Sequence, residues 1–111
     1  MYDLKGKVAL VTGAARYPST GRALALRLAQ EGADVVINGR YRSPNSLTEE
    51  ERERNWRGVE SVKEEVESLG KKALGIYADV TEPGEVRRMF EEIENHFGRL
   101  DICLLYTSDA A

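Results

Sequence analysis

The sequence has few of the residues that build disulfide-linked, metal-bound or membrane-inserted proteins. Its 111 residues include one cysteine, one histidine and three prolines. A single cysteine, Cys103, excludes an internal disulfide framework, and His96 has no second ligand near it in the sequence, so we expect no metal site. The N-terminal segment lacks the basic flank and long apolar core of a secretory signal. These absences predict a cytoplasmic protein that does not insert into membranes.

A strong excess of one charge is also lacking. The chain has 16 Lys and Arg against 19 Asp and Glu, for a formal net charge of −3. Basic residues alternate with acidic ones instead of forming a block, which argues against binding to nucleic acid or to an acidic membrane surface. A composition of 41% hydrophobic and 32% charged residues indicates one modest globular domain with a core of its own.

What the sequence does contain is a regular alternation of strand-like and helix-like segments. Short apolar, β-branched runs predict strands at residues 7–12, 34–38, 73–78 and 100–105. Between them, helix formers and apolar stripes predict three helices: residues 21–31; a helix with the stripe Trp56, Val59, Val62, Val66 and Leu69; and a helix capped by Thr81 with the stripe Val86, Phe90, Ile93 and Phe97. The order β-α-β-α-β-α-β predicts an α/β fold, the first half of a Rossmann-type doubly wound parallel sheet.

The turn after the first predicted strand, TGAARYPSTGRA at residues 12–23, has the composition of a phosphate-binding loop. In a βαβ unit such a turn lies at the carboxyl edge of the sheet, where free amides at the helix N-terminus favour an anion. Gly13 and Gly21 allow a pyrophosphate to approach the backbone, and Ser19 and Thr20 supply hydroxyl donors. We therefore predict a dinucleotide site; the alternative is an ordinary strand-to-helix loop with a capping hydroxyl.

The end of the second predicted strand bears on the choice of cofactor. A carboxylate there would bind the 2′-hydroxyl of NAD and repel the 2′-phosphate of NADP. The chain has Asn38-Gly39-Arg40 instead, and Arg16 lies in the glycine turn, so we expect two guanidinium groups to converge on a 2′-phosphate. This pattern favours NADP over NAD. The alternative for Arg40 is a solvated loop arginine in a neighbourhood rich in arginine.

Four segments together resemble the N-terminal half of a short-chain dehydrogenase/reductase: KGKVALVTGAAR, GRALALRLAQEGADVVINGR, YADVTEPGEV and FGRLDI. The resemblance implies that residues 1–102 form the NAD(P)-binding half of a Rossmann domain. It also implies that Asp79 accepts a hydrogen bond from the adenine amine and that Val80 packs on the ring. The alternative for Asp79 is an aspartate at the entry of the third helix, beside the predicted helix cap Thr81.

The resemblance further implies what the intact protein does. Members of this family transfer a hydride between a nicotinamide cofactor and a small carbonyl or alcohol substrate, as in 3-oxoacyl reductases and alcohol dehydrogenases, and they usually form dimers or tetramers. The serine and the Tyr-x-x-x-Lys motif of the family follow its fourth strand, and no tyrosine here has a lysine four residues later. No catalytic residue is therefore predicted in this chain, and we expect it to be inactive alone.

Two departures from the family pattern leave alternatives open. The glycine turn is two residues longer than usual and lacks its middle glycine, which predicts an outward bulge at Tyr17-Pro18. The same spacing is similar to the divergent enoyl-reductase branch, matched by Gly13 and Ser19, with Gly21 in place of the alanine of that branch. A third hypothesis is a non-catalytic NADP-binding sensor protein.

The segment before the second helix is about eight residues longer than the family suggests. Within this extension, around residues 44–56, the run 49–54 is predicted to be a solvated helix face, with a substrate-side or subunit contact as the alternative. Residues 103–111 are predicted to be a non-native read-through tail, because the sequence CLLYTSDAA can be encoded by a transposase sequencing adapter. The alternative for this tail is a true C-terminus.

Overall fold

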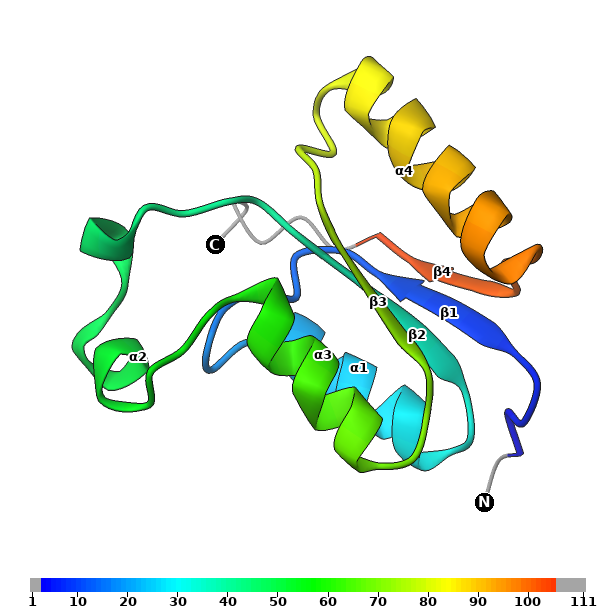
Figure 1. The fold of residues 1–111 in the computed structure, drawn as a ribbon, viewed down its shortest axis with the longest axis horizontal. Helices are drawn as coiled ribbons and strands as arrows, with labels where there is room; N and C mark the ends of the chain where they lie inside the picture. The colour runs from blue at the N-terminus through cyan, green and yellow to red at the C-terminus, as the bar shows by residue number, and fades with distance from the viewer. Residues whose placement is uncertain (1–2, 106–111) are drawn as a thin grey trace.

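A computed structural model describes residues 3–105 of the chain. The elements follow in the order β1 (Val8–Val11), α1 (Thr20–Gln30), β2 (Asp34–Gly39), the short 3₁₀ helix η1 (Pro44–Ser46), α2 (Glu49–Glu53), α3 (Val59–Ser68), β3 (Ala73–Tyr77), α4 (Pro83–Phe97) and β4 (Ile102–Leu104). All four predicted strands are present, and so are the three predicted helices. The extension between β2 and α3 adds η1 and α2, which lie to one side of the sheet (Figure 1).

The strands form one parallel sheet in the order β3-β2-β1-β4. The chain moves outward from β1 to β3 and then returns across the sheet to β4, on the other side of β1. Right-handed crossovers in opposite directions place α1 and α3 on one face of the sheet and α4 on the other (Figure 1). This confirms the predicted α/β, doubly wound fold. The reversal leaves a switch point at the carboxyl ends of β1 and β4, where ligands bind in such sheets.

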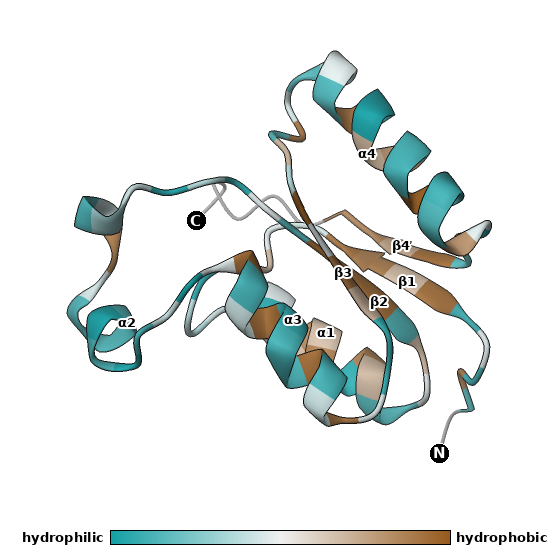
Figure 2. Ribbon diagram, in the orientation of Figure 1, coloured by the Kyte–Doolittle hydropathy of each residue, from teal (hydrophilic) through white to brown (hydrophobic). Residues whose placement is uncertain are grey.

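A separate apolar cluster lies on each face of the sheet. On one face, side chains of β1 and β2 pack against α1 and α3; the cluster includes Val11, Val35, Ile37, Ala25, Ala29, Val59, Val62 and Val66. On the other, strand residues pack against α4; this cluster includes Val8, Leu10, Val36, Ile76, Met89 and Ile93. Strand β1 is therefore apolar along its length and β2 is apolar from Val35 to Ile37, as expected for a sheet covered on both faces (Figure 2).

The start and the buried face of α4 differ from the prediction. Thr81 does not cap the helix: α4 begins at Pro83, a residue suited to the first helical position, and the N-cap Glu82 makes no side-chain capping bond. The Thr81 hydroxyl donates to Asp79 instead, at 2.6 Å. Phe90 is 37% exposed, whereas Met89 is fully buried. The predicted stripe was therefore one residue off at this position.

The second predicted helix is shorter than its apolar stripe. Val59, Val62 and Val66 are buried on α3 as predicted, but Trp56 precedes the helix and Leu69 is 40% exposed at its end. Gly58 has φ of +67° at the N-cap, a non-helical backbone conformation, so the helix begins only at Val59 and Trp56 lies outside it. Trp56 is nonetheless buried, so the prediction of a core residue is confirmed but its placement on the helix was wrong.

Within residues 3–105, none of the helices has the length and apolar character needed to cross a bilayer. Strand β4 includes Cys103 and Leu104 and pairs with β1, so the first residues of the segment predicted to be non-native take part in the sheet. Residues 106–111 of that segment lie outside the described residues. The boundary at Ile102 stays a prediction.

Candidate dinucleotide-binding site

The glycine turn joins β1 to α1 at the switch point of the sheet. Gly13 has φ of +64°, in the left-handed region that favours glycine. Gly21, in the first turn of α1, lies directly on the start of the turn: a Cβ atom there would stand 2.6 Å from the Gly13 carbonyl oxygen and 2.8 Å from the Ala14 Cα. The structure thus brings the two predicted glycines together, and only a residue without a side chain fits at Gly21.

The N-terminus of α1 offers free donors to an anion. Ser19 is the N-cap, and its Oγ accepts a hydrogen bond from the Arg22 amide at 3.1 Å. The backbone N–H groups of Thr20 and Gly21 find no acceptor within residues 3–105. These amides stand at the positive end of the helix dipole, an arrangement that binds phosphate groups in βαβ units.

The inserted part of the turn folds against the extension instead of bulging into solvent. The ring of Tyr17 is half-buried and lies 5.2 Å from that of Trp56. The guanidinium groups of Arg22 and Arg54 lie over the Tyr17 ring, 4.6 and 4.1 Å from its centroid. The prediction of an outward bulge was therefore wrong for Tyr17, because stacking on the indole and two cations stabilises an inward orientation. Of the two residues of the predicted bulge, Pro18 is exposed.

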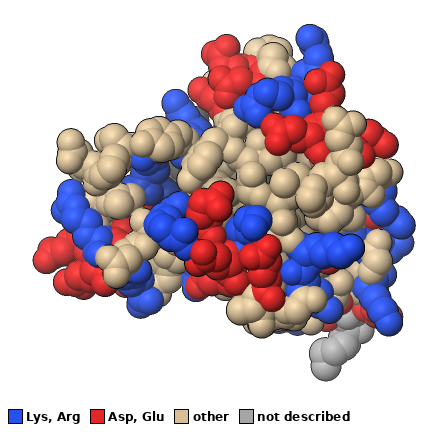
Figure 3. Space-filling view, viewed as in Figure 1, with Lys and Arg blue, Asp and Glu red and all other residues tan. Residues whose placement is uncertain are grey.

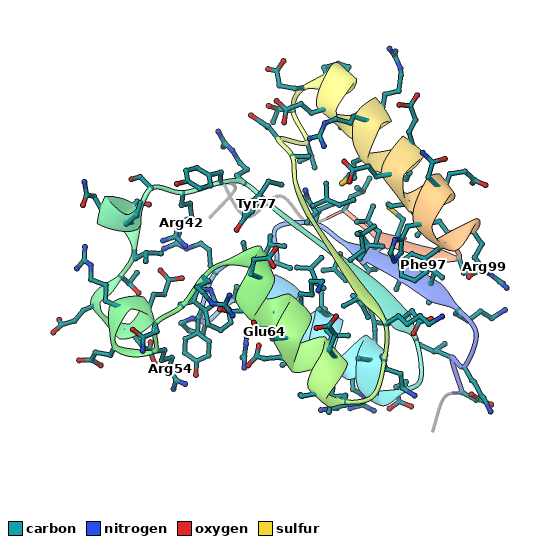
Figure 4. The ribbon with its side chains drawn as sticks, viewed as in Figure 1. Arg42, Arg54, Glu64, Tyr77, Phe97 and Arg99 are labelled. Carbon is teal, nitrogen blue, oxygen red and sulfur yellow. The ribbon has the colours of Figure 1, made fainter. Side chains whose placement is uncertain are left out.

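Glu51 in α2 is the residue that the sequence interpretation missed. It was predicted to lie on a solvated helix face, but its side chain is 0% exposed. The carboxylate accepts hydrogen bonds from the Tyr17 amide at 2.8 Å, from the Thr48 amide at 3.0 Å and from Arg42 at 2.9 and 3.1 Å. Thr48 in turn accepts from the Glu51 amide, which completes a capping box. Figure 4 shows Arg42, which lies on the loop between β2 and η1.

The environment of Glu51 acts on its pKa in opposite directions. Burial raises the pKa, but hydrogen bonds from Arg42 and from the Thr48 and Tyr17 amides outweigh burial and lower it from 4.5 to about 2. The carboxylate is therefore ionised at every pH at which the protein is expected to function. An ionised group held in this way contributes stability only while it keeps its charge.

We expect this contribution of Glu51 to be lost in acid. Because its folded pKa is lowered, the stabilisation is complete above about pH 4.5, the ordinary value, and disappears as pH falls through about 2. The measurement is the melting temperature of the purified protein and of Glu51→Gln between these two pH values. The difference between them should shrink steadily toward the acid end; a difference that stays constant would contradict the assignment.

Two further polar side chains hold the turn and the strand ends together. The Trp56 indole N–H donates to the Ala15 carbonyl at 2.7 Å. The side-chain amide of Asn38, buried near the end of β2, donates to the Ile76 and Ala78 carbonyls at 3.2 Å each. The backbone carbonyl of Asn38 accepts from the Ala14 amide at 2.9 Å. A polar residue ending an apolar strand was visible in the sequence for Asn38, but nothing local indicated its partners.

The residues predicted to select the cofactor are only partly brought together. Arg40 is 71% exposed, and its guanidinium lies 3.5 Å from the Asp79 carboxylate. Arg16 is exposed and forms no ion pair within residues 3–105. Arg40 and Asp79, which were assigned to the 2′-phosphate and to adenine, are therefore neighbours at the carboxyl ends of β2 and β3.

Asp79 has local hydrogen bonds as well. Its Oδ1 accepts from the Thr81 amide at 2.9 Å and from the Thr81 hydroxyl, and these bonds lower the pKa of Asp79 below its ordinary value, with a smaller effect from Arg40. Asp79 is therefore hydrogen-bonded to Thr81, but Thr81 is not the helix cap that the alternative interpretation of Asp79 assumed. Val80 is half-buried and packs against the apolar cluster under α4.

A hollow of about 230 Å³ lies between the turn, the strand ends and the extension. Its lining includes Ala15, Arg40, Arg42, Arg57 and Tyr77. The Tyr77 ring makes an edge contact with the Tyr41 ring, with the ring centroids 5.9 Å apart, and Figure 4 shows Tyr77 at the end of β3.

The charged side chains near the hollow are largely paired. Glu51 pairs with Arg42 and Glu64 with Arg57, so acidic and basic side chains are interspersed around α2 and α3 (Figure 3).

Comparison with known proteins agrees with this geometry. The model of the short chain dehydrogenase family matches residues 7–106. The chain is 43% identical over 100 residues to hydroxynaphthalene reductase-like protein Arp2 of Metarhizium robertsii and 44% identical over 102 residues to cyclohexanol dehydrogenase of a Rhodococcus species. The two matches include 90% and 91% of this chain but only 32% and 36% of the two relatives, so the chain spans about a third of the length of these relatives.

Solved structures give the same result. A short-chain type dehydrogenase/reductase from Mycobacterium marinum superposes with a TM-score of 0.71 and 35% identity, over 91% of this chain and 34% of that one. A short-chain dehydrogenase/reductase variant from Serratia marcescens superposes with a TM-score of 0.72 and 31% identity, over 92% and 36% of the two chains. With its doubly wound sheet and its glycine turn at the switch point, the chain belongs to the short-chain dehydrogenase/reductase family of oxidoreductases.

Proposed function

We propose that this chain is the NADP(H)-binding part of an oxidoreductase that transfers a hydride between NADP(H) and a carbonyl or alcohol substrate. The observation that carries the proposal is the close approach of Gly21 to Gly13 beneath the free amides of Thr20 and Gly21. This arrangement leaves room for a pyrophosphate against the backbone at the helix N-terminus. When bound, the nicotinamide would supply or accept the hydride.

The residues of this chain would bind and orient the cofactor. The Thr20 and Gly21 amides and the Ser19 hydroxyl would face the pyrophosphate, and Asp79 and Val80 would hold the adenine. The proton-transferring serine, tyrosine and lysine of the family would come from outside these 111 residues. The absence of space for a Cβ at Gly21 supports the ordinary branch of the family over the enoyl-reductase pattern, which has alanine there.

The choice of NADP over NAD rests on charge at the ends of β2 and β3. No carboxylate ends β2, and Arg40, Arg42 and Arg57 line the adjacent hollow. Arg16 is free to turn toward a 2′-phosphate. We further propose a small-molecule substrate, a cytoplasmic location and a homodimer or homotetramer of the intact enzyme.

Replacement of Arg40 tests the cofactor assignment. In the intact enzyme, Arg40→Ala should weaken NADPH binding about tenfold and leave NADH binding unchanged, because a charge-assisted hydrogen bond to the 2′-phosphate is lost. Arg16→Ala should act in the same direction, and Arg87→Ala, an exposed arginine on α4, is the matched control. Tighter binding of NADH than NADPH by the wild type, or full NADPH affinity in both variants, would refute the choice of NADP.

Turnover tests the reaction. The intact enzyme should oxidise NADPH in the presence of ketone or aldehyde substrates and reduce NADP with the corresponding alcohols. Activity confined to carbon–carbon double bonds would instead indicate an enoyl reductase. Tight NADPH binding without turnover of any such substrate would indicate a sensor protein.

A further inference from the structure

The two departures from the family pattern, the longer glycine turn and the extension between β2 and α3, contact each other in the structure. The Tyr17 amide donates to the Glu51 carboxylate at 2.8 Å, and the Trp56 indole donates to the Ala15 carbonyl at 2.7 Å. The rings of Tyr17 and Trp56 lie 5.2 Å apart. All these contacts fall on residues 15–17, in the part of the turn that lies between the end of β1 and the start of α1.

A phosphate-binding turn is effective only if its amides are held in place before the ligand arrives. Ordering a flexible loop on binding costs conformational entropy, so a turn that is already fixed binds more tightly. The turn here is two residues longer than the family pattern and lacks its middle glycine. The contacts from Glu51 and Trp56 supply the restraint that the sequence of the turn does not.

The position of Glu51 also requires charge compensation. A bare carboxylate beside a pyrophosphate would repel it, but the two oxygens of Glu51 accept from Arg42 at 2.9 and 3.1 Å. Arg42 belongs to the loop that follows β2, two residues after Arg40. The Arg42–Glu51 pair therefore joins the ribose side of the site to its pyrophosphate side without leaving a net charge.

We propose that Glu51 is a positioning residue for dinucleotide binding: through the Tyr17 amide it fixes the enlarged glycine turn in the conformation that presents the α1 amides to the pyrophosphate. The inference rests on the proposed function of the chain. Glu51 itself does not contact the cofactor. The extension and the longer turn then form one structural unit, in which contacts from the extension restrain the turn that has gained two residues.

The test is Glu51→Gln in the intact enzyme, with NADPH and NADH binding measured by calorimetry. Loss of the charge-assisted bonds should weaken both dinucleotides by the same factor, about tenfold, because both share the pyrophosphate. Arg40→Ala should by contrast weaken NADPH alone. The KM of Glu51→Gln for the cofactor should rise, while its kcat at saturating cofactor and its KM for the second substrate should stay close to wild type.

The matched control is Glu53→Gln, which removes the charge of an exposed glutamate on the same helix and should leave both affinities unchanged. A purely structural role for Glu51 would lower the melting temperature of the free enzyme without changing either dissociation constant well below that temperature. That result would overturn the inference. If the wild type binds neither dinucleotide, it is the proposed function that fails.

A second variant decides the question if Glu51→Gln does not fold. Trp56→Phe removes the indole N–H that donates to Ala15 but keeps an aromatic ring against Tyr17. It should weaken NADPH and NADH severalfold and equally, since a neutral hydrogen bond contributes less than a charged one. Wild-type affinity for both dinucleotides in Trp56→Phe would contradict the proposal.

Discussion

Replacing Gly21 by alanine is expected to lower the free energy of unfolding by about 3 kcal/mol, the upper end of the usual overpacking penalty, and to abolish dinucleotide binding. The added Cβ would lie 2.6 Å from the Gly13 carbonyl oxygen and 2.8 Å from the Ala14 Cα, both of which are backbone atoms. These backbone atoms can be relieved of the clash only if α1 moves away from β1. This movement would displace the amides that face the pyrophosphate. Urea unfolding and NADPH titration of the intact enzyme measure the two effects.

Gly84→Ala is the control for this prediction. Gly84 lies in the first turn of α4, and a Cβ there has no atom within 4 Å. Alanine has the higher helix propensity, so this variant should be as stable as wild type or more stable by up to about 1 kcal/mol. If Gly21→Ala unfolds at the same urea concentration as wild type, the close packing of α1 on the turn is refuted.

Replacing Arg42 by methionine is expected to cost about 3 kcal/mol, because it leaves the buried Glu51 carboxylate without its cation. The side chain of Glu51 is 0% exposed and that of Arg42 is 19% exposed, so water cannot fully replace the lost partner. We also expect weaker dinucleotide binding, since Glu51 holds the Tyr17 amide. Denaturant unfolding of the intact enzyme gives the change in stability.

A double variant separates the charge from the packing. Arg42→Met combined with Glu51→Met removes both charges and should recover part of the stability lost in Arg42→Met. Lys63→Met removes one member of an exposed pair on α3, with Glu67 at 3.1 Å, and should change stability by less than about 0.5 kcal/mol. Equal effects of Arg42→Met and Lys63→Met would show that the Arg42–Glu51 pair is not buried in solution.

The fold could be predicted from the sequence because its elements depend on local patterns. Consecutive β-branched residues such as Val35 and Val36 indicate strands covered on both faces, and the spacing of Val59, Val62 and Val66 indicates a helix with one buried side. The alternation of these patterns then allows few topologies. Helix ends were predicted less well, because the Thr81 hydroxyl had an equally good local partner in Asp79.

The candidate site was predictable in part for the same reason. Gly13 and Gly21 were identified from their position between a strand and a helix, and the structure shows why both are glycines. The residues Thr48 and Glu51 form a capping box in the structure, a feature that the sequence interpretation did not identify. Nothing local indicated that the Glu51 carboxylate would be buried against Arg42 and the Tyr17 amide, while Glu49 and Glu50 on the same helix are exposed.

The sequence by itself determined the class of fold, the place of the glycine turn and the absence of a carboxylate at the end of β2, because these depend on residues close together in the chain. Only the tertiary structure decided that Glu51 is buried and that Tyr17 turns inward. Their contact joins residues 34 positions apart, and it forms only after the sheet has placed the turn beside the extension. Burial and charge compensation depend on what the fold brings together in space, and a local pattern does not contain that information.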